Sequence, residues 1–161
     1  ILAICWGLQV CSTAAGGKVN PGKNGAHIGI ASNVIINNDG HKHFIYNDKK
    51  NEFITPAFNF DEVSELPKNA TLLSSDKVNN VMGVSFNVGN SEITGLQYHP
   101  DYEYYQMINL IEGRKERLFK NKNFLNEEEY KKHISYIKAE NELLNFEDRT
   151  CEVRNWLNHI K

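Results

Sequence analysis

The sequence predicts an α/β fold in which a mostly parallel central sheet is flanked by helices. The chain opens with a short, uniformly apolar run, which is typical of a buried parallel strand. Several short strand patterns follow before residue 100, and beyond it apolar residues recur at helical spacing. A length of 161 residues fits one domain. We therefore expect residues 1–161 to form a single domain with a helical extension from about 103 to 161.

The first elements are predicted to be a strand, a sharp turn and a helix. Residues 1–4 are all apolar, which favours a buried strand. Residues 5–15 contain no proline, and their apolar side chains recur at spacings of three and four, as on one face of a helix. Two glycines at 16–17 then predict the end of that helix.

The middle of the chain is predicted to consist of short strands and turns. Residues 18–26 contain proline and two glycines and are interpreted as a loop. Residues 27–36 place apolar side chains on alternate positions, which predicts a strand, and Asn-Asn-Asp-Gly at 37–40 predicts a turn. Further short strands are expected at 53–58, 70–74, 82–87 and 93–98.

Three helices are predicted after residue 101. The first covers residues 102–119 and contains Gly113, which costs about 1 kcal/mol relative to alanine in a helix. The second begins after Asn126, because three glutamates follow this potential cap and favour the positive end of a helix. The last covers residues 149–160.

Composition excludes several classes of protein. There are 18 Lys and Arg residues against 20 Asp and Glu residues, for a net charge of −2, so nucleic acid is not expected as a partner. The apolar runs are far shorter than the ~18 residues of a membrane span, so no membrane partner is expected. Cys5, Cys11 and Cys151 cannot all pair, which indicates a reducing compartment and predicts a cytoplasmic location.

The turn after the first strand carries a candidate nucleophile. Residues 3–7 read Ala-Ile-Cys-Trp-Gly, the small-x-nucleophile-x-Gly pattern of a nucleophile elbow. In such a turn the flanking residues must be small, because the strand and the helix approach each other closely. The thiol of Cys5 would then lie at a helix N-terminus, where the backbone N–H groups and the helix dipole favour a thiolate.

A candidate base lies at the end of a later predicted strand. His99 could transfer protons to and from the sulfur, and Asp101 could hold the imidazole in the required tautomer. The residues alone leave a second interpretation open, in which Cys5 is a buried structural cysteine and His99 an ordinary histidine at a strand end.

Two strings resemble the signatures of class I glutamine amidotransferases: Cys-Trp-Gly-Leu-Gln at residues 5–9 and Gly-Leu-Gln-Tyr-His-Pro at 95–100. The likeness is to the stand-alone branch that is similar to the amidotransferase domain of GMP synthetase, and Asp-Glu-Val at 61–63 also fits. The resemblance extends from residue 1 to about 110, and a weaker resemblance is found at 149–157. The resemblance implies the flavodoxin-like fold of that family.

The resemblance also implies an activity, the hydrolysis of the glutamine side-chain amide through a γ-glutamyl thioester. Cys5 would be the nucleophile, His99 the acid and base, and Asp101 the orienting acid. The backbone N–H of Trp6 would stabilise the oxyanion, and Gln9 would hold the substrate, which is glutamine or another γ-glutamyl small molecule. No cofactor and no metal site are implied, and any synthetase partner would be a separate polypeptide.

The sequence departs from the family pattern at three places. The second signature usually ends in glutamate, but here Asp101 stands at that position, and Glu103 is an alternative orienting acid. Ala3 replaces the usual glycine two residues before the nucleophile. The family's N-terminal half, with the first strands of the sheet and a second oxyanion donor, has no counterpart in these residues. We therefore expect them to be the C-terminal two-thirds of the domain in a longer natural chain, and this fragment alone to be inactive if that half is needed.

Two other functions stay open at this level. One is a γ-glutamyl hydrolase or peptidase of the same superfamily, and the other is a non-catalytic remnant domain. The released product, ammonia or an amino compound, distinguishes the first from a glutaminase.

Overall fold

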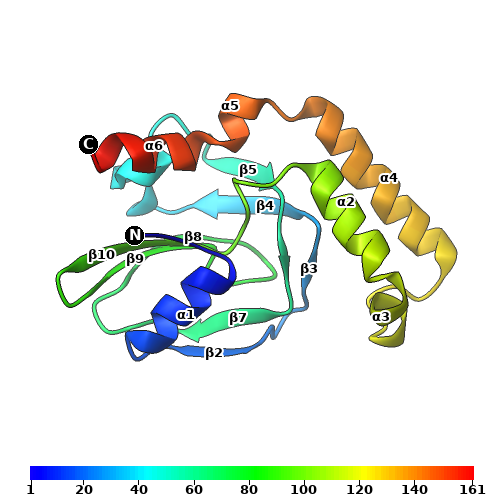
Figure 1. Ribbon diagram of the computed structural model, residues 1–161, viewed down its shortest axis with the longest axis horizontal. Helices are drawn as coiled ribbons and strands as arrows, with labels where there is room; N and C mark the ends of the chain where they lie inside the picture. The colour runs from blue at the N-terminus through cyan, green and yellow to red at the C-terminus, as the bar shows by residue number, and fades with distance from the viewer.

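A computed structural model describes residues 1–161 (Figure 1). Its strands are β1 (Leu2–Ile4), β2 (Lys18–Pro21), β3 (His27–Ile28), β4 (Ala31–Ile36), β5 (Glu52–Thr55), β6 (Phe58–Asn59), β7 (Asp61–Glu65), β8 (Thr71–Ser75), β9 (Gly83–Val88) and β10 (Ser91–Leu96). Its helices are α1 (Trp6–Ala14), α2 (Tyr104–Gly113), α3 (Lys115–Lys120), α4 (Glu127–Leu143), α5 (Phe146–Arg149) and α6 (Cys151–His159), with short 3-10 helices η1 (Gly40–Lys42) and η2 (Phe44–Tyr46).

The α/β fold class is confirmed, and a six-stranded sheet in the order β1-β10-β9-β8-β4-β5 forms its centre. The predicted mostly parallel pairing is wrong for the strands of this chain, because only β1 and β10 pair in parallel. Residues 89–90 alone connect β9 to β10. A two-residue connection can join only antiparallel strands, whereas parallel neighbours need a long crossover.

Different elements cover the two faces of the sheet. On one face α1 and the small β2–β7 sheet enclose a core that includes Ala3, Leu8, Val63 and Val84. On the other face η2 and the C-terminal helix α6 pack against a core that includes Leu73 and Leu96. The sheet is thus buried on both sides.

A third core lies at one end of the molecule, where α2 and α4 lie side by side (Figure 1). Both helices contribute isoleucines to it, including Ile111 and Ile137, which are fully buried. Asn126 caps α4 as predicted, and its side chain accepts the Glu129 N–H at 2.9 Å. None of the helices combines the length and the apolar character needed to cross a membrane.

Two predicted segments form structure that local pattern did not indicate. Residues 18–21, predicted as loop, form β2, which pairs with β7, a strand that was not predicted either. Both strands are short and polar, and their pairing is a tertiary contact. The predicted helix over 102–119 is broken at Arg114 into α2 and α3, and α5 precedes the last helix, which begins at Cys151 rather than at 149.

The predicted strand over 27–36 is interrupted at Gly29, which divides it into β3 and β4. Gly29 has a φ of 89°, in the region that favours glycine. A Cβ atom at this position would lie 2.6 Å from Cδ1 of Ile111 and 2.9 Å from Cδ1 of Ile137. The α2–α4 core therefore packs directly against this backbone.

We expect Gly29→Ala to lower the free energy of unfolding by about 2–4 kcal/mol, through backbone strain and overpacking together. Gly16→Ala is the matched control, because Gly16 has nearly the same φ of 90° and no heavy atom within 4 Å of its Cβ position. It should cost about 1 kcal/mol, from strain alone. Urea denaturation measures both values, and equal losses would contradict the packing argument.

Candidate active site

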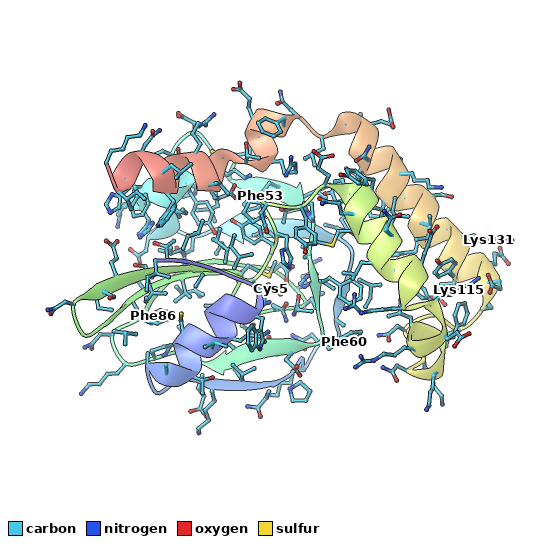
Figure 2. All side chains as sticks on the ribbon, in the orientation of Figure 1. Cys5, Phe53, Phe60, Phe86, Lys115 and Lys131 are labelled. Atoms are coloured by element: carbon cyan, nitrogen blue, oxygen red, sulfur yellow. The ribbon has the colours of Figure 1, made fainter.

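Cys5 occupies a sharp turn between β1 and α1, as the sequence predicted (Figures 1 and 2). Its φ of 51° is unfavourable for a residue that is not glycine. The surrounding structure holds this conformation, because the Cys5 N–H donates to the Leu96 carbonyl at 2.7 Å and the Cys5 carbonyl accepts the Gln9 N–H at 3.2 Å. The backbone therefore presents the thiol at the start of a helix.

Small side chains allow the strand and the helix to approach at this turn. A Cβ atom on Gly7 would lie 3.9 Å from that of Ala3, an ordinary contact, so alanine is accommodated at position 3. Gly95 on β10 has no such room, since its Cβ would overlap with Cδ1 of Leu8. The close approach of α1 to β10 thus depends on Gly95.

His99 follows β10 and lies beside Asp101, with 3.2 Å between its Nδ1 and Oδ1 of the carboxylate. Its backbone N–H donates to the Pro56 carbonyl at 2.7 Å, which fixes the segment. Burial alone would lower the pKa of His99, but the interactions with Asp101 and Cys5 outweigh it and raise the pKa to about 9. The imidazole is therefore paired with Asp101, and Cys5 lies near enough to favour its charged form.

Asp101, rather than Glu103, is the carboxylate that contacts His99. Burial opposes ionisation of Asp101, but the hydrogen bond and charge of His99 lower its pKa overall. The Glu103 carboxylate lies 3.4 Å from the guanidinium of Arg149, and its backbone N–H donates to Gln106. Glu103, the alternative orienting acid, is thus paired with Arg149.

Two amide side chains form a chain of hydrogen bonds that ends at the sulfur. Nε2 of Gln9 donates to the Asp61 carbonyl at 2.9 Å and to Oε1 of Gln97 at 3.3 Å. Nε2 of Gln97 in turn lies 3.6 Å from Sγ of Cys5, and the Cys5 thiol donates to the Phe58 carbonyl at 3.7 Å. Gln97 was not predicted as a site residue, although it stands two positions before His99 in the second signature.

Trp6, the predicted oxyanion donor, is the first residue of α1. Its N–H has no acceptor within the helix, because the first N–H groups of a helix lack one. Its side chain is 74% exposed. The donor is therefore available beside the sulfur, and the indole lies outside the core.

A second buried network supports the segment that carries His99. The hydroxyl of Tyr98 donates to Glu152 at 2.7 Å, and Glu152 also pairs with Lys49 at 3.0 Å. Both Tyr98 and Glu152 are completely buried, and burial raises the pKa of each. Glu152 was not predicted, because only the folded chain brings α6 behind Tyr98.

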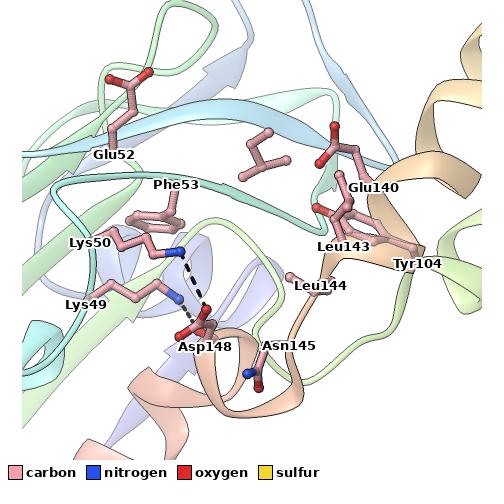
Figure 3. Close-up of a pocket in the computed structure, with 11 residues that line it drawn as sticks. Lys49, Lys50, Glu52, Phe53, Tyr104, Glu140, Leu143, Leu144, Asn145 and Asp148 are labelled. Atoms are coloured by element: carbon pink, nitrogen blue, oxygen red, sulfur yellow. Dashed lines mark hydrogen bonds and ion pairs between the residues drawn. The ribbon is translucent and has the colours of Figure 1, made fainter.

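A pocket of about 240 Å³ lies elsewhere, between β5 and the α4–α5 connection (Figure 3). Figure 3 shows Tyr104, Glu140 and Leu143 together at one end and Lys50 facing Asp148, at 3.7 Å, at the other. No cysteine, serine or histidine lines it. The candidate site is therefore assigned to Cys5 and its neighbours.

Comparison with known proteins gives a family match. A family model described as glutamine amidotransferase class-I matches residues 1–111. The chain is 27% identical to a γ-glutamyl-L-1-hydroxyisopropylamide hydrolase of a Pseudomonas species over 99% of this chain and 60% of that protein. It is 35% identical to γ-glutamyl peptidase 5 of Arabidopsis thaliana (70% and 44%) and 31% identical to a glutamine-hydrolysing GMP synthase subunit of Methanococcus vannielii (69% and 55%).

Solved structures agree with this fold. The chain matches a glutamine amidotransferase of Thermotoga maritima with a TM-score of 0.70 at 23% identity, covering 99% of this chain and 61% of that one. It likewise spans between 44% and 60% of the curated relatives named above.

We expect Asp101→Asn to lower the pKa of His99 toward its ordinary value of 6.5, because the neutral amide removes a charge that favours the imidazolium. NMR titration of the imidazole measures this shift. Glu103→Gln is the matched control and should leave the titration unchanged, and the opposite ranking of the two variants would contradict the assignment.

The same pKa predicts a pH dependence of stability. Because the pKa of His99 is raised from 6.5 to about 9 by folding, its interactions stabilise the protein fully below about pH 6.5. This contribution should disappear as the pH rises through about 9. Denaturation of the wild type and of His99→Gln across this range would test it, since the difference between them should shrink with rising pH.

Proposed function

The chain belongs to the class-I glutamine amidotransferase family, and from this premise we propose that it hydrolyses the side-chain amide of glutamine to glutamate and ammonia, with Cys5 as nucleophile. The observation that carries the proposal is the strained turn at Cys5, near which lies a histidine that is itself hydrogen-bonded to a carboxylate. This arrangement is the one that nucleophilic amide hydrolysis requires.

In the first half of the reaction, the Cys5 thiolate attacks the side-chain carbonyl carbon of glutamine. The oxygen becomes an oxyanion in the tetrahedral intermediate, and the Trp6 N–H at the start of α1 stabilises it. The C–N bond then breaks, and ammonia leaves with the proton that His99 carries. The product on the enzyme is a γ-glutamyl thioester.

In the second half, water hydrolyses the thioester. His99, now neutral, takes a proton from the attacking water, and the C–S bond breaks to release glutamate and the Cys5 thiolate. Asp101 keeps the imidazole oriented through the Nδ1 contact in both halves. The sum consumes one glutamine and one water and yields glutamate and ammonia.

Gln9 is proposed to help hold the substrate, as it lies one turn into α1 with its amide directed toward the same site. The relatives named as glutamine-hydrolysing GMP synthase subunits support a further proposal, that a separate synthetase polypeptide uses the ammonia.

A second candidate reaction is the hydrolysis of other γ-glutamyl compounds. It is favoured by the relatives named as a γ-glutamyl amide hydrolase and as γ-glutamyl peptidases, the first of which matches across 99% of this chain. The chemistry would be the same, except that an amine or a peptide leaves in place of ammonia.

We expect Cys5→Ala in the intact protein to reduce hydrolysis by at least about a thousandfold, because the variant has no thiol at the turn to form the thioester. The measurements are ammonia released from glutamine and amine released from γ-glutamyl alkylamides. Cys11→Ala is the matched control and should retain activity, because Cys11 lies on α1 and packs against the core.

Ammonia release that survives Cys5→Ala would contradict the nucleophile. The ratio of the two products decides between the glutaminase and the γ-glutamyl hydrolase.

A further inference from the structure

Gln97 reaches the Cys5 sulfur from inside the protein. Its side chain is completely buried, and its Nε2 lies 3.6 Å from Sγ. We propose that Gln97 is a further catalytic residue, which donates a hydrogen bond to the Cys5 thiolate and keeps the negative charge on the sulfur before attack. This inference rests on the proposed role of Cys5 as the nucleophile.

The orientation of the Gln97 amide follows from its neighbours. A backbone carbonyl can only accept, so the contact with the Asp61 carbonyl requires Gln9 to direct its NH₂ group there. The same nitrogen donates to Oε1 of Gln97, at 3.3 Å. Gln97 therefore turns its oxygen toward Gln9 and its own NH₂ group toward the sulfur.

Two groups near the sulfur favour opposite protonation states. The Phe58 carbonyl, 3.7 Å from Sγ, can only accept and thus favours the thiol. The Gln97 amide donates and thus favours the thiolate. A hydrogen bond to a charged acceptor is stronger than one to a neutral acceptor, and the buried position of Gln97 strengthens it further.

The position of Gln97 does not depend on its side-chain amide. Its backbone N–H donates to the Met82 carbonyl at 2.9 Å, and its neighbour Leu96 is held by the β1–β10 and β9–β10 pairings. A substitution of similar shape can therefore remove the donor while the strand end stays in place.

The test is the rate at which iodoacetamide alkylates Cys5 in the intact protein, followed by mass spectrometry from pH 5 to pH 10. Gln97→Met keeps the length of the side chain and removes the donor. We expect alkylation at pH 7 to be about fivefold to tenfold slower than in the wild type, with the same plateau rate at high pH, where the sulfur is fully ionised.

Gln97→Glu gives an independent measurement if the methionine variant folds poorly. The carboxylate has the same shape but places a negative charge beside the sulfur, so alkylation at pH 7 should be slower than in the wild type. Gln106→Met is the matched control, since Gln106 is a half-buried residue whose side chain accepts the Glu103 N–H at the start of α2, and it should reproduce the wild-type profile.

An unchanged profile in Gln97→Met overturns the proposal, and so does a loss of rate that persists at the high-pH plateau, because that would indicate altered access rather than altered ionisation. Alkylation requires no substrate, so the test is separate from that of the reaction. If the alkylation profiles are as expected but neither glutamine nor γ-glutamyl alkylamides are hydrolysed, the proposed function is overturned, whereas the proposed hydrogen bond from Gln97 to the sulfur is supported.

Discussion

The parallel pairing of β1 with β10 is the constraint on which the candidate site depends. Its register places Ile4 beside Leu96, so both strands end at the same edge of the sheet. Cys5 is the next residue after one strand, and His99 lies three residues beyond the end of the other. The hydrogen bond from the Cys5 N–H to the Leu96 carbonyl then supports the strained turn at the sulfur. Two segments far apart in the sequence thus meet at one point.

The C-terminal helices fix the other side of this meeting point. The Tyr98 hydroxyl donates a hydrogen bond to Glu152 on α6. The guanidinium of Arg149 donates to the Pro100 and Tyr102 carbonyls at 3.0 and 3.2 Å. The residues on both sides of His99 are therefore held from α5 and α6. Buried networks of this kind are costly to leave incomplete. This gives the segment after residue 111, outside the family match, a physical role in the site.

The departures from the family pattern are accommodated in different ways. Asp101 contacts His99 although it is one methylene shorter than the usual glutamate, and Arg149 engages Glu103. Ala3 fits because Gly7 opposite it has no side chain and the intervening space is of ordinary van der Waals size. The turn at Cys5 and the His99–Asp101 pair are thus compatible with the residues present.

The sequence by itself determined the elements whose signals are local. These are the opening strand, the turn at Cys5, the helix ended by two glycines, the Asn126 cap and the pairing of His99 with a nearby carboxylate, along with the family. Only the tertiary structure decided the antiparallel sheet, the β2–β7 pair, the break at Gly29 and the contacts of Gln97 and Glu152. Apart from the β9–β10 hairpin, each of these depends on contacts between segments far apart in the chain, which local sequence patterns do not reveal.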